Sequence, residues 1–336
     1  MLPRLSFLLA LCCLSLAVKA QPVRLIFDTD MGNDVDDALA LAIIHALESR
    51  GEAKLLAVTV TKDNKWAAPY IDAVNTFYGR GDVPIGVVKD GKTPDDRDMI
   101  RVPAGRRNAD GSYVYPHDLV DGTTAPDAVS VLRKTLAAEP DSAVTIVQVG
   151  FSTNLARLLD SGPDQYSPLN GRALVRRKVR LLSMMAGAFP EGNPEYNVVT
   201  DIPAARHVFA DWPTPIITSG FEVGATILYP VRSILWHYGY VPDHPIVDAY
   251  KNLLPMPYDR PTWDLTAVLY AVRPDGGYFD LSEPGTIGVR DDGCTYLVPA
   301  RDGQRRYLKV DDIQRARILE AEMELASQPP DRASIP

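Results

Sequence analysis

The sequence predicts a single large α/β domain with a mostly parallel central sheet, helices on both faces and small antiparallel elements near the C-terminus. Two observations favour this class. Apolar runs typical of strands alternate with helix patterns from Val23 to Gly220. The apolar runs are continuous rather than of period two, as expected for strands that are buried on both faces of a parallel sheet.

The elements follow one another in a regular order. A strand at Val23–Phe27 precedes a helix pattern at Ala38–Gly51, which ends in Arg50 and a glycine stop. Further strands are predicted at 53–61, 83–88, 143–150, 179–187 and 214–220, and further helices at 68–81, 127–140, 152–162 and 201–211. The polar segment Lys89–Pro126 is too long for an ordinary connection, which predicts a functional loop or lid. Turn residues in Gly285–Val310 predict short antiparallel strands before a C-terminal helix.

Residues 1–20 have the three-part pattern of a secretory signal peptide. Arg4 precedes an apolar run from Leu5 to Val18, and small residues precede a cleavage site after Ala20. The apolar run is too short to span the hydrocarbon core of a membrane. We therefore predict a mature domain of residues 21–336, secreted or periplasmic, with no membrane association after cleavage.

Charge and cysteine content exclude several classes of partner and of stabilising bond. Cleavage would change the net charge from −8 to −10, because it removes Arg4 and Lys19 and no carboxylate. An acidic protein is a poor match for nucleic acid or for anionic lipid, so neither is expected as a partner. Cys12 and Cys13 belong to the leader, and Cys294 remains without a second cysteine for an intramolecular disulfide.

Five aspartates are crowded between the first strand and the first helix, at positions 28, 30, 34, 36 and 37. In open α/β sheets, ligands bind at the carboxyl ends of the strands. Helix capping explains aspartates in a first helical turn, but Asp28 and Asp30 belong to the strand end. A hard cation with oxygen ligands would neutralise several carboxylates, and the lack of histidine and cysteine here favours Ca²⁺, then Mg²⁺, over Zn²⁺. A phosphatase of the Asp-x-Asp type is an alternative that leaves Asp36 and Asp37 unexplained.

Residues 28–41, "DTDMGNDVDDALAL", resemble the N-terminal signature of the inosine–uridine preferring nucleoside hydrolases, Asp-x-Asp-Pro-Gly-x-Asp-Asp-Ala. They depart from it at Met31, where proline is usual, and by two extra residues before the final acidic pair. Residues 149–159, 184–205 and 261–272 resemble three further blocks of that family in the same order. The resemblance implies the family's fold and Ca²⁺-dependent hydrolysis of the N-glycosidic bond of a ribonucleoside or related ribosyl compound.

The resemblance also implies individual roles around the cation. By this resemblance, the ligands of Ca²⁺ are the carboxylates of Asp30, Asp37 and Asp264 and the main-chain carbonyl of Thr153. Asp30 would also accept a proton from the attacking water, whose pKa a nearby cation lowers. Asp36 would bind ribose hydroxyls, and the two extra residues leave open whether Asp34 takes that role instead.

Four more residues are implied to bind the substrate. Glu195 and Asn197 in "PEYN" match the family's Glu-Phe-Asn, which grips sugar hydroxyls. Asn64 and Asn193 match other family asparagines less closely, and ordinary hydrogen bonding in a turn explains them as well.

Trp263 stands where many members carry the histidine that protonates the leaving base. Its indole N–H does not act as an acid, although the ring can stack on an aromatic leaving group. His117 is then the first candidate for the acid, followed by His237 and His244, whereas His45 and His207 lie in helical patterns and are expected to be structural.

Two other functions remain open from the sequence. The chain is also compatible with a Ca²⁺-dependent nucleoside or sugar binder without catalytic activity, and with a hydrolase of another glycoside. The resemblance also admits a homo-oligomer.

Overall fold

The structure is a computed structural model that describes residues 21–190 and 192–331. The predicted signal peptide, residues 1–20, lies outside the described residues. Across the two described ranges, no helix combines the length and the apolar character that a membrane span requires.

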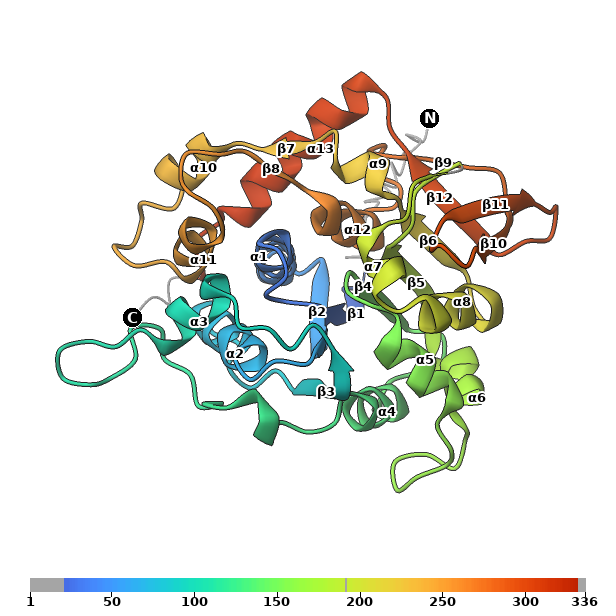
Figure 1. Cartoon of the computed structure of the whole chain (residues 1–336), viewed down its shortest axis with the longest axis horizontal. Coiled ribbons are helices and arrows are strands. Elements are labelled where there is room, and N and C mark those ends of the chain that lie inside the picture. The colour runs from blue at the N-terminus through green and yellow to red at the C-terminus, as the bar shows by residue number, and fades with distance from the viewer. Residues whose placement is uncertain (1–20, 191, 332–336) are drawn as a thin grey trace, which may run out of the picture.

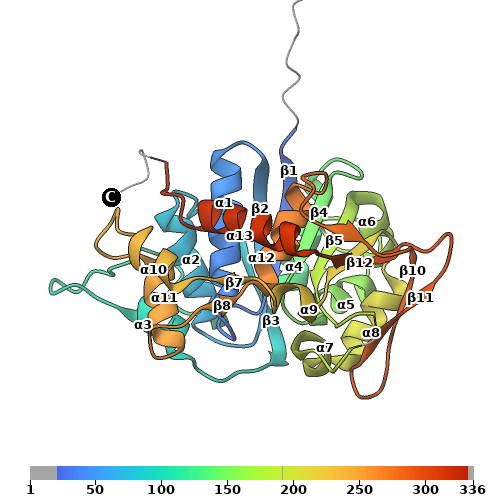
Figure 2. The same ribbon diagram turned by 90° about the horizontal axis from the view of Figure 1, so that it is seen from above.

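A ten-stranded sheet forms the centre of the domain (Figure 1), in the order β11-β10-β12-β6-β5-β4-β1-β2-β3, with β9 paired to β12. Neighbouring strands from β3 across to β12 are parallel, and β9, β10 and β11 add antiparallel pairs. The strands are β1 (Val23–Thr29), β2 (Ala53–Lys62), β3 (Ile85–Lys92), β4 (Val144–Gln148), β5 (Val179–Met185), β6 (Ile216–Ser219), β9 (Asp280–Leu281), β10 (Gly285–Val289), β11 (Thr295–Pro299) and β12 (Arg305–Lys309). Figure 2 shows β10 and β11 at one end of the sheet. The predicted mostly parallel α/β class, with antiparallel C-terminal strands, is confirmed.

Two layers of helices cover the two faces of the sheet, and each layer has its own apolar core. One layer contains α1 (Asp36–Ser49), α2 (Ala67–Phe77), α12 (Trp263–Val272) and α13 (Asp312–Ala326). The other contains α4 (Ala128–Ala138), α5 (Thr153–Asp160), α6 (Gly171–Lys178) and α8 (Ile202–Asp211). The shorter elements are α3 (Asp98–Gly105), η1 (Gly122–Thr124), α7 (Tyr196–Thr200), α9 (Phe221–Gly224), α10 (Val231–Trp236), α11 (Pro245–Leu253) and a separate antiparallel ribbon of β7 (Leu228–Tyr229) and β8 (Arg260–Pro261).

Helix α1 is buried almost along its whole length because it packs against β2 as well as α12 and α13. A helix enclosed in this way must be apolar on all sides, and residues 38–47 of α1 are apolar except for His45. His45, in the middle of α1, contacts the Asn75 side chain through Nε2 at 2.9 Å and stacks on Tyr78. This histidine is structural, as predicted.

The strand order creates a crevice at one point of the sheet. From β1 the chain continues to β2 and β3 on one side, and then returns to the other side for β4, β5 and β6. In such sheets the ligand site lies at this switch point, beyond the carboxyl ends of the two central strands. A Cβ on Gly150, just after β4, would approach the main-chain nitrogen of Asp30 to 2.6 Å, so glycine is needed for this close contact. The segments that follow β1 and β4 therefore form the floor of one site.

The long polar segment 89–126 is more structured than predicted. Its start extends β3 to Lys92, and α3 and η1 follow within it. Helix α3 packs against α2 and α11, with Met99 and Ile100 buried. It was missed because it is short and contains Pro103, which interrupts a helical pattern.

Candidate active site and cation centre

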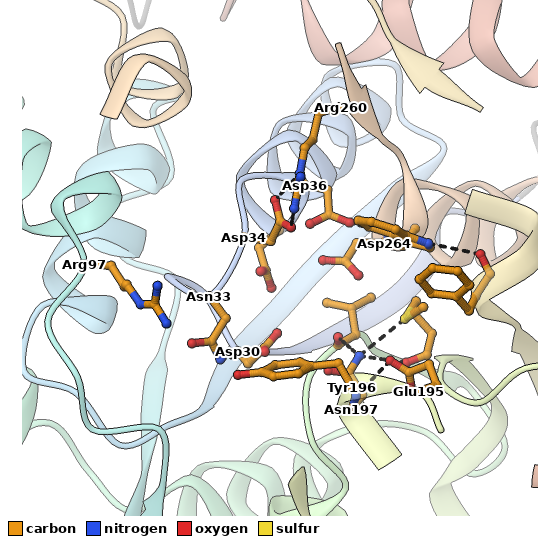
Figure 3. Close-up of a pocket in the computed structure, with 15 residues that line it drawn as sticks. Asp30, Asn33, Asp34, Asp36, Arg97, Glu195, Tyr196, Asn197, Arg260 and Asp264 are labelled. Carbon is orange, nitrogen blue, oxygen red and sulfur yellow. Dashed lines mark hydrogen bonds and ion pairs between the residues drawn. The ribbon is translucent and has the colours of Figure 1, made fainter. Parts of the chain in front are cut away.

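A cavity of about 300 Å³ lies beyond the carboxyl ends of β1, β4 and β5 (Figure 3). Its walls come from segments that are far apart in the sequence, including the first turns of α1, α7 and α12. It is lined by Asp30, Asn33, Asp34, Asp36, Asp37, Arg97, Val149, Met185, Glu195, Tyr196, Asn197, Phe221, Arg260, Trp263 and Asp264. Six of these residues are carboxylic acids, so the cavity is strongly acidic.

Three buried aspartates meet in this cavity as a cation centre: Asp36, Asp37 and Asp264. Each offers a carboxylate oxygen, and these ligand atoms all lie within 4.8 Å of one another. Burial and repulsion by neighbouring aspartates, among them Asp30 and Asp34, raise the pKa of all three carboxyls well above the ordinary value. Oxygen ligands in a buried, repelling group fit a hard cation, which would cancel the repulsion. The predicted ligands Asp37 and Asp264 are thus brought together, with Asp36 as the third member.

Local structure holds the aspartates of the cation centre in place. The Thr29 hydroxyl at the end of β1 donates a hydrogen bond to Asp37. The main-chain N–H of Asp264, in the first turn of α12, donates to the Asp36 carboxylate at 3.2 Å. Asp36 and Asp37 themselves lie in the first turn of α1, where the helix dipole favours negative charge.

Asp30 lines the same cavity beside the cation centre, but its carboxylate is not one of the three grouped ligand atoms. Burial raises its pKa to about 6, and a hydrogen bond from the Asn33 side chain at 2.8 Å opposes this rise. Gly32, which has φ of +113°, allows the tight turn between the two residues. Asp30 is therefore held as a buried carboxyl that can exchange a proton near neutral pH.

Lys62 supports Asp30 through Asn33. Its fully buried ammonium group donates to Asn33 Oδ1 at 2.9 Å, to the carbonyl of Thr93 at 2.7 Å and to Asp95 at 3.3 Å. Asn33 is thereby oriented so that its amide N–H points to Asp30. These hydrogen bonds, from Lys62 to Asn33 and from Asn33 to Asp30, connect the end of β2 to the cavity.

We expect Lys62→Met to lower turnover about tenfold, because the charge-assisted bond that orients Asn33 is worth ~1.5–3 kcal/mol. Steady-state kinetics beside thermal unfolding would measure this. The matched control is Arg133→Met, which removes another buried cation, bound to Asp164 at 2.7 Å outside the cavity. The control should lose stability and keep its turnover. Full activity in Lys62→Met would contradict the role of the hydrogen bonds from Lys62 through Asn33 to Asp30.

The charge of Asp34 is balanced by Arg260. Arg260, in β8, donates from Nε to Asp34 at 2.8 Å and makes a second bond from its terminal nitrogen. Both residues line the cavity, and the guanidinium lies 5.5 Å from the ring centre of Trp263. The two candidate sugar-binding aspartates therefore have different surroundings. Asp34 is ion-paired with Arg260, whereas Asp36 faces Asp264.

Glu195 and Asn197 reach the cavity as predicted from the "PEYN" motif. The Glu195 carboxylate caps α7 and accepts the main-chain N–H groups of Gly187, Asn197 and Val198 at 2.9, 2.8 and 3.2 Å. Burial raises its pKa to about 7. The Asn197 amide donates to the carbonyls of Val149 at 2.7 Å and Met185 at 3.1 Å. These bonds fix both side chains at the carboxyl ends of β4 and β5.

Three predicted residues, Thr153, Asn64 and Asn193, are not among the residues that line the cavity. The Thr153 hydroxyl donates to Asp201 at 2.5 Å on another side of α5, and Val149, four residues earlier, lines the cavity instead. The reason is that the chain passes the cavity at the end of β4 and has turned into α5 by residue 153. Asn64 is tied to the carbonyls of Pro94 and Asp95 at 3.1 Å each, and Asn193 is exposed to solvent.

All five histidines lie in the described part of the chain, and none of them lines the cavity. His117 contacts the carbonyl of Tyr115 through Nδ1 at 2.7 Å, and His237 contacts Ser233 at 3.0 Å. His207 lies between Asp160 and Asp211, and burial lowers the pKa of His244 to about 3. The prediction that His117, His237 or His244 protonates the leaving group therefore lacks the necessary proximity.

Trp263 does line the cavity, next to Phe221. The two rings stack with centres 5.4 Å apart, and the indole N–H donates to the carbonyl of Phe221 at 3.0 Å. The indole is thus fixed as part of an aromatic wall.

Asp28 does not line the cavity. It is fully buried and accepts hydrogen bonds from Thr59 at 2.6 Å and Asn154 at 2.8 Å. The Asp-x-Asp phosphatase alternative needs this first aspartate as an accessible nucleophile, and its burial argues against that reading.

Several cavity residues were not predicted from the sequence. Asn33 and Tyr196 lie inside motifs that were recognised, so their neighbours could have indicated them. Val149 and Met185 lie at the starts of two recognised blocks, whereas Arg97, Phe221 and Arg260 carry no local signal and are brought to the cavity by the fold.

The fold and the site define an α/β protein with an acidic cavity at the switch point of its sheet, in which three aspartates are grouped closely enough to hold a metal ion. The sequence profile described as inosine-uridine preferring nucleoside hydrolase matches residues 25–319, and the chain belongs to this family.

Individual relatives agree with this membership. The pyrimidine-specific ribonucleoside hydrolase RihA of Citrobacter koseri is 32% identical over 209 residues, which cover 59% of this chain and 60% of the relative. The purine-preferring ribonucleoside hydrolase from Gardnerella vaginalis superposes with a TM-score of 0.66 at 18% identity, covering 90% of this chain and 98% of the other. The type III effector XopQ, solved in complex with adenosine diphosphate ribose, has a TM-score of 0.66 at 17% identity, covering 92% and 95%. The structural likenesses show a shared fold.

Proposed function

We propose that this protein hydrolyses the N-glycosidic bond of a ribonucleoside or a related ribosyl compound and requires Ca²⁺. The observation that carries the proposal is the meeting of the cation centre with Asp30, Glu195 and Asn197 in one cavity. Family membership and the ribonucleoside hydrolases among the relatives support the reaction class.

Ca²⁺ is the cation that best suits the donor set, because it accepts six to eight oxygen ligands in flexible geometry. Asp37, Asp264 and Asp36 would hold it, with Asp30 beside them in the same cavity. Bound there, the cation would lower the pKa of nearby water and attract the hydroxyls of a sugar.

The chain's own groups then perform the reaction. Asp30, buried and oriented by Asn33, accepts a proton from the water that attacks the anomeric carbon. Glu195 and Asn197 bind sugar hydroxyls, and the negative charge of Glu195 stabilises the positive charge that develops on the sugar ring. The aromatic wall of Trp263 and Phe221 stacks against the leaving base.

The direct test is the release of free ribose from inosine, adenosine and uridine in the presence of CaCl₂, followed by a reducing-sugar assay. Turnover of at least one ribosyl compound is expected. A complete absence of free sugar would contradict the proposal.

We expect Trp263→Ala to raise KM for nucleosides about tenfold, because stacking a base on an aromatic ring is worth ~1–3 kcal/mol. The value of kcat should change less than KM, since stacking is present before and during bond cleavage. Trp212→Phe serves as a matched control, because Trp212 is buried away from the cavity. An unchanged KM for every nucleoside would remove Trp263 from base recognition.

A second function is favoured by one observation, the replacement of the family histidine by Trp263 in a cavity that no histidine lines. A Ca²⁺-dependent binder of nucleosides would keep the pocket without the reaction. Titration calorimetry with nucleosides, run beside the ribose assay, separates the two functions. Tight binding without released sugar would establish the binder.

We also propose that the protein acts outside the cytoplasm. The leader pattern of residues 1–20 and the acidic mature chain support export and a small-molecule substrate. Mass spectrometry of the exported protein tests this, and a mature N-terminus at Gln21 is expected.

A further inference from the structure

We propose that the Tyr196 hydroxyl donates the proton to the leaving base, with Arg97 placed to stabilise the phenolate that results. This inference rests on the proposed hydrolysis and names the acid that the reaction still needs. Cleavage of the C–N bond leaves an electron pair on a base nitrogen, and most nucleobases leave poorly unless that nitrogen is protonated.

The other protic groups of the cavity are already engaged. The indole N–H of Trp263 donates to the carbonyl of Phe221, and the amide of Asn197 donates to two carbonyls. The Glu195 carboxylate accepts three main-chain N–H groups, so its oxygens are oriented as acceptors. Asn33 donates to Asp30, and Arg260 is paired with Asp34.

The Tyr196 phenol differs from these groups. Apart from Thr200 in the same helix, no described residue offers its hydroxyl a hydrogen-bond partner, and the Thr200 hydroxyl itself donates to the main-chain oxygen of Tyr196 at 2.7 Å. The residue is 50% exposed, at the opening of the cavity. Its ring is held edge-on against Phe151, with ring centres 5.9 Å apart. The phenol is therefore positioned and available to a ligand.

Arg97 lies on the side toward which the phenol points. In Figure 3 the Tyr196 ring extends away from Glu195, toward the side of the cavity where Asn33 and Arg97 lie. Arg97 is fixed by a bond from Nε to Asp95 at 2.5 Å, and its charge lowers the pKa of Tyr196, against the rise caused by burial, by Asp30 and by Asp95 itself. The raised pKa keeps the phenol protonated before reaction, and the guanidinium favours the phenolate when the proton leaves.

The step is balanced. The C–N bond breaks and its electron pair goes to the base nitrogen, which takes the phenolic proton. Water adds to the anomeric carbon and gives its proton to Asp30. Exchange with solvent then returns a proton to Tyr196 and removes one from Asp30, so that the sum is ribosyl compound plus water to sugar plus base.

The matching segment of the family reads Glu-Phe-Asn where this chain has Glu-Tyr-Asn, so Tyr196→Phe removes one oxygen and restores the family residue. We expect this variant to lose about 10²-fold in kcat on inosine and adenosine, in the range of general acid catalysis. It should keep its kcat within about twofold on 4-nitrophenyl β-D-ribofuranoside, whose leaving group needs no proton. Arg97→Gln should show the same pattern with a smaller loss.

The control is Tyr113→Phe, which alters a tyrosine that packs on His117 outside the cavity and should change neither rate. Thermal unfolding of all variants checks that they fold. Equal losses on both kinds of substrate, or no loss on nucleosides, would overturn the role of Tyr196. Wild-type protein that cleaves neither kind of substrate would instead overturn the proposed hydrolysis, and the acid with it.

Discussion

Asp30→Asn is expected to lower kcat about 10²–10⁴-fold on any ribosyl compound that the wild type cleaves, because general base catalysis contributes that much. The amide cannot accept the proton of the attacking water, yet it has the size of the carboxylate and can keep the contact with Asn33. Steady-state kinetics with saturating CaCl₂ measure the loss.

The control for this change is Asp72→Asn. Asp72 is also buried, and it accepts the main-chain N–H groups of Asp118 and Leu119 at 3.0 and 2.9 Å outside the cavity. It should lose stability and keep its turnover. Turnover of Asp30→Asn at the wild-type rate would remove Asp30 from the mechanism.

Ca²⁺ is expected to raise the melting temperature of metal-free protein strongly. The cation centre holds three buried carboxylates that repel one another, and a bound cation turns this repulsion into attraction. At a free concentration of 100 times Kd, binding to the folded state adds ~2.7 kcal/mol of stability. Calorimetric unfolding with EDTA and with CaCl₂ measures the shift, and activity should disappear with EDTA.

Asp264→Asn makes this test specific. Removal of one repelling charge should stabilise the metal-free protein, while the response to Ca²⁺ becomes much smaller. Asp72→Asn should respond to Ca²⁺ as the wild type does. If the melting temperature of the wild type does not change with Ca²⁺, the cation centre binds no Ca²⁺.

The fold could be predicted because its signals are local. Continuous apolar strands such as 143–150 and helices such as 38–51 reveal a doubly covered parallel sheet through their periodicity alone. The carboxyl end of the first strand is then a site by the general rule for such sheets, and the crowded aspartates mark it. Glu195 and Asn197 could be predicted to lie together for a similar reason, because they belong to one short motif, and both line the cavity.

Residues that reach the cavity from elsewhere could not be predicted in the same way. Arg97 lies in a polar segment that shows no motif, and Arg260 lies in a two-residue strand. The placement of Thr153 has the same origin: the motif block includes both Val149 and Thr153, and the turn after Gly150 brings Val149 to the cavity.

By itself, the sequence determined the α/β class, the cluster of aspartates after the first strand and the presence of Trp263 where many family members carry a histidine. Tertiary structure decided that Asp36, Asp37 and Asp264 are grouped together, that no histidine lines the cavity, and that Tyr196 and Arg97 line the same cavity. The physical reason is that local periodicity fixes which face a residue presents, whereas the order of strands in the sheet fixes which distant residues meet there.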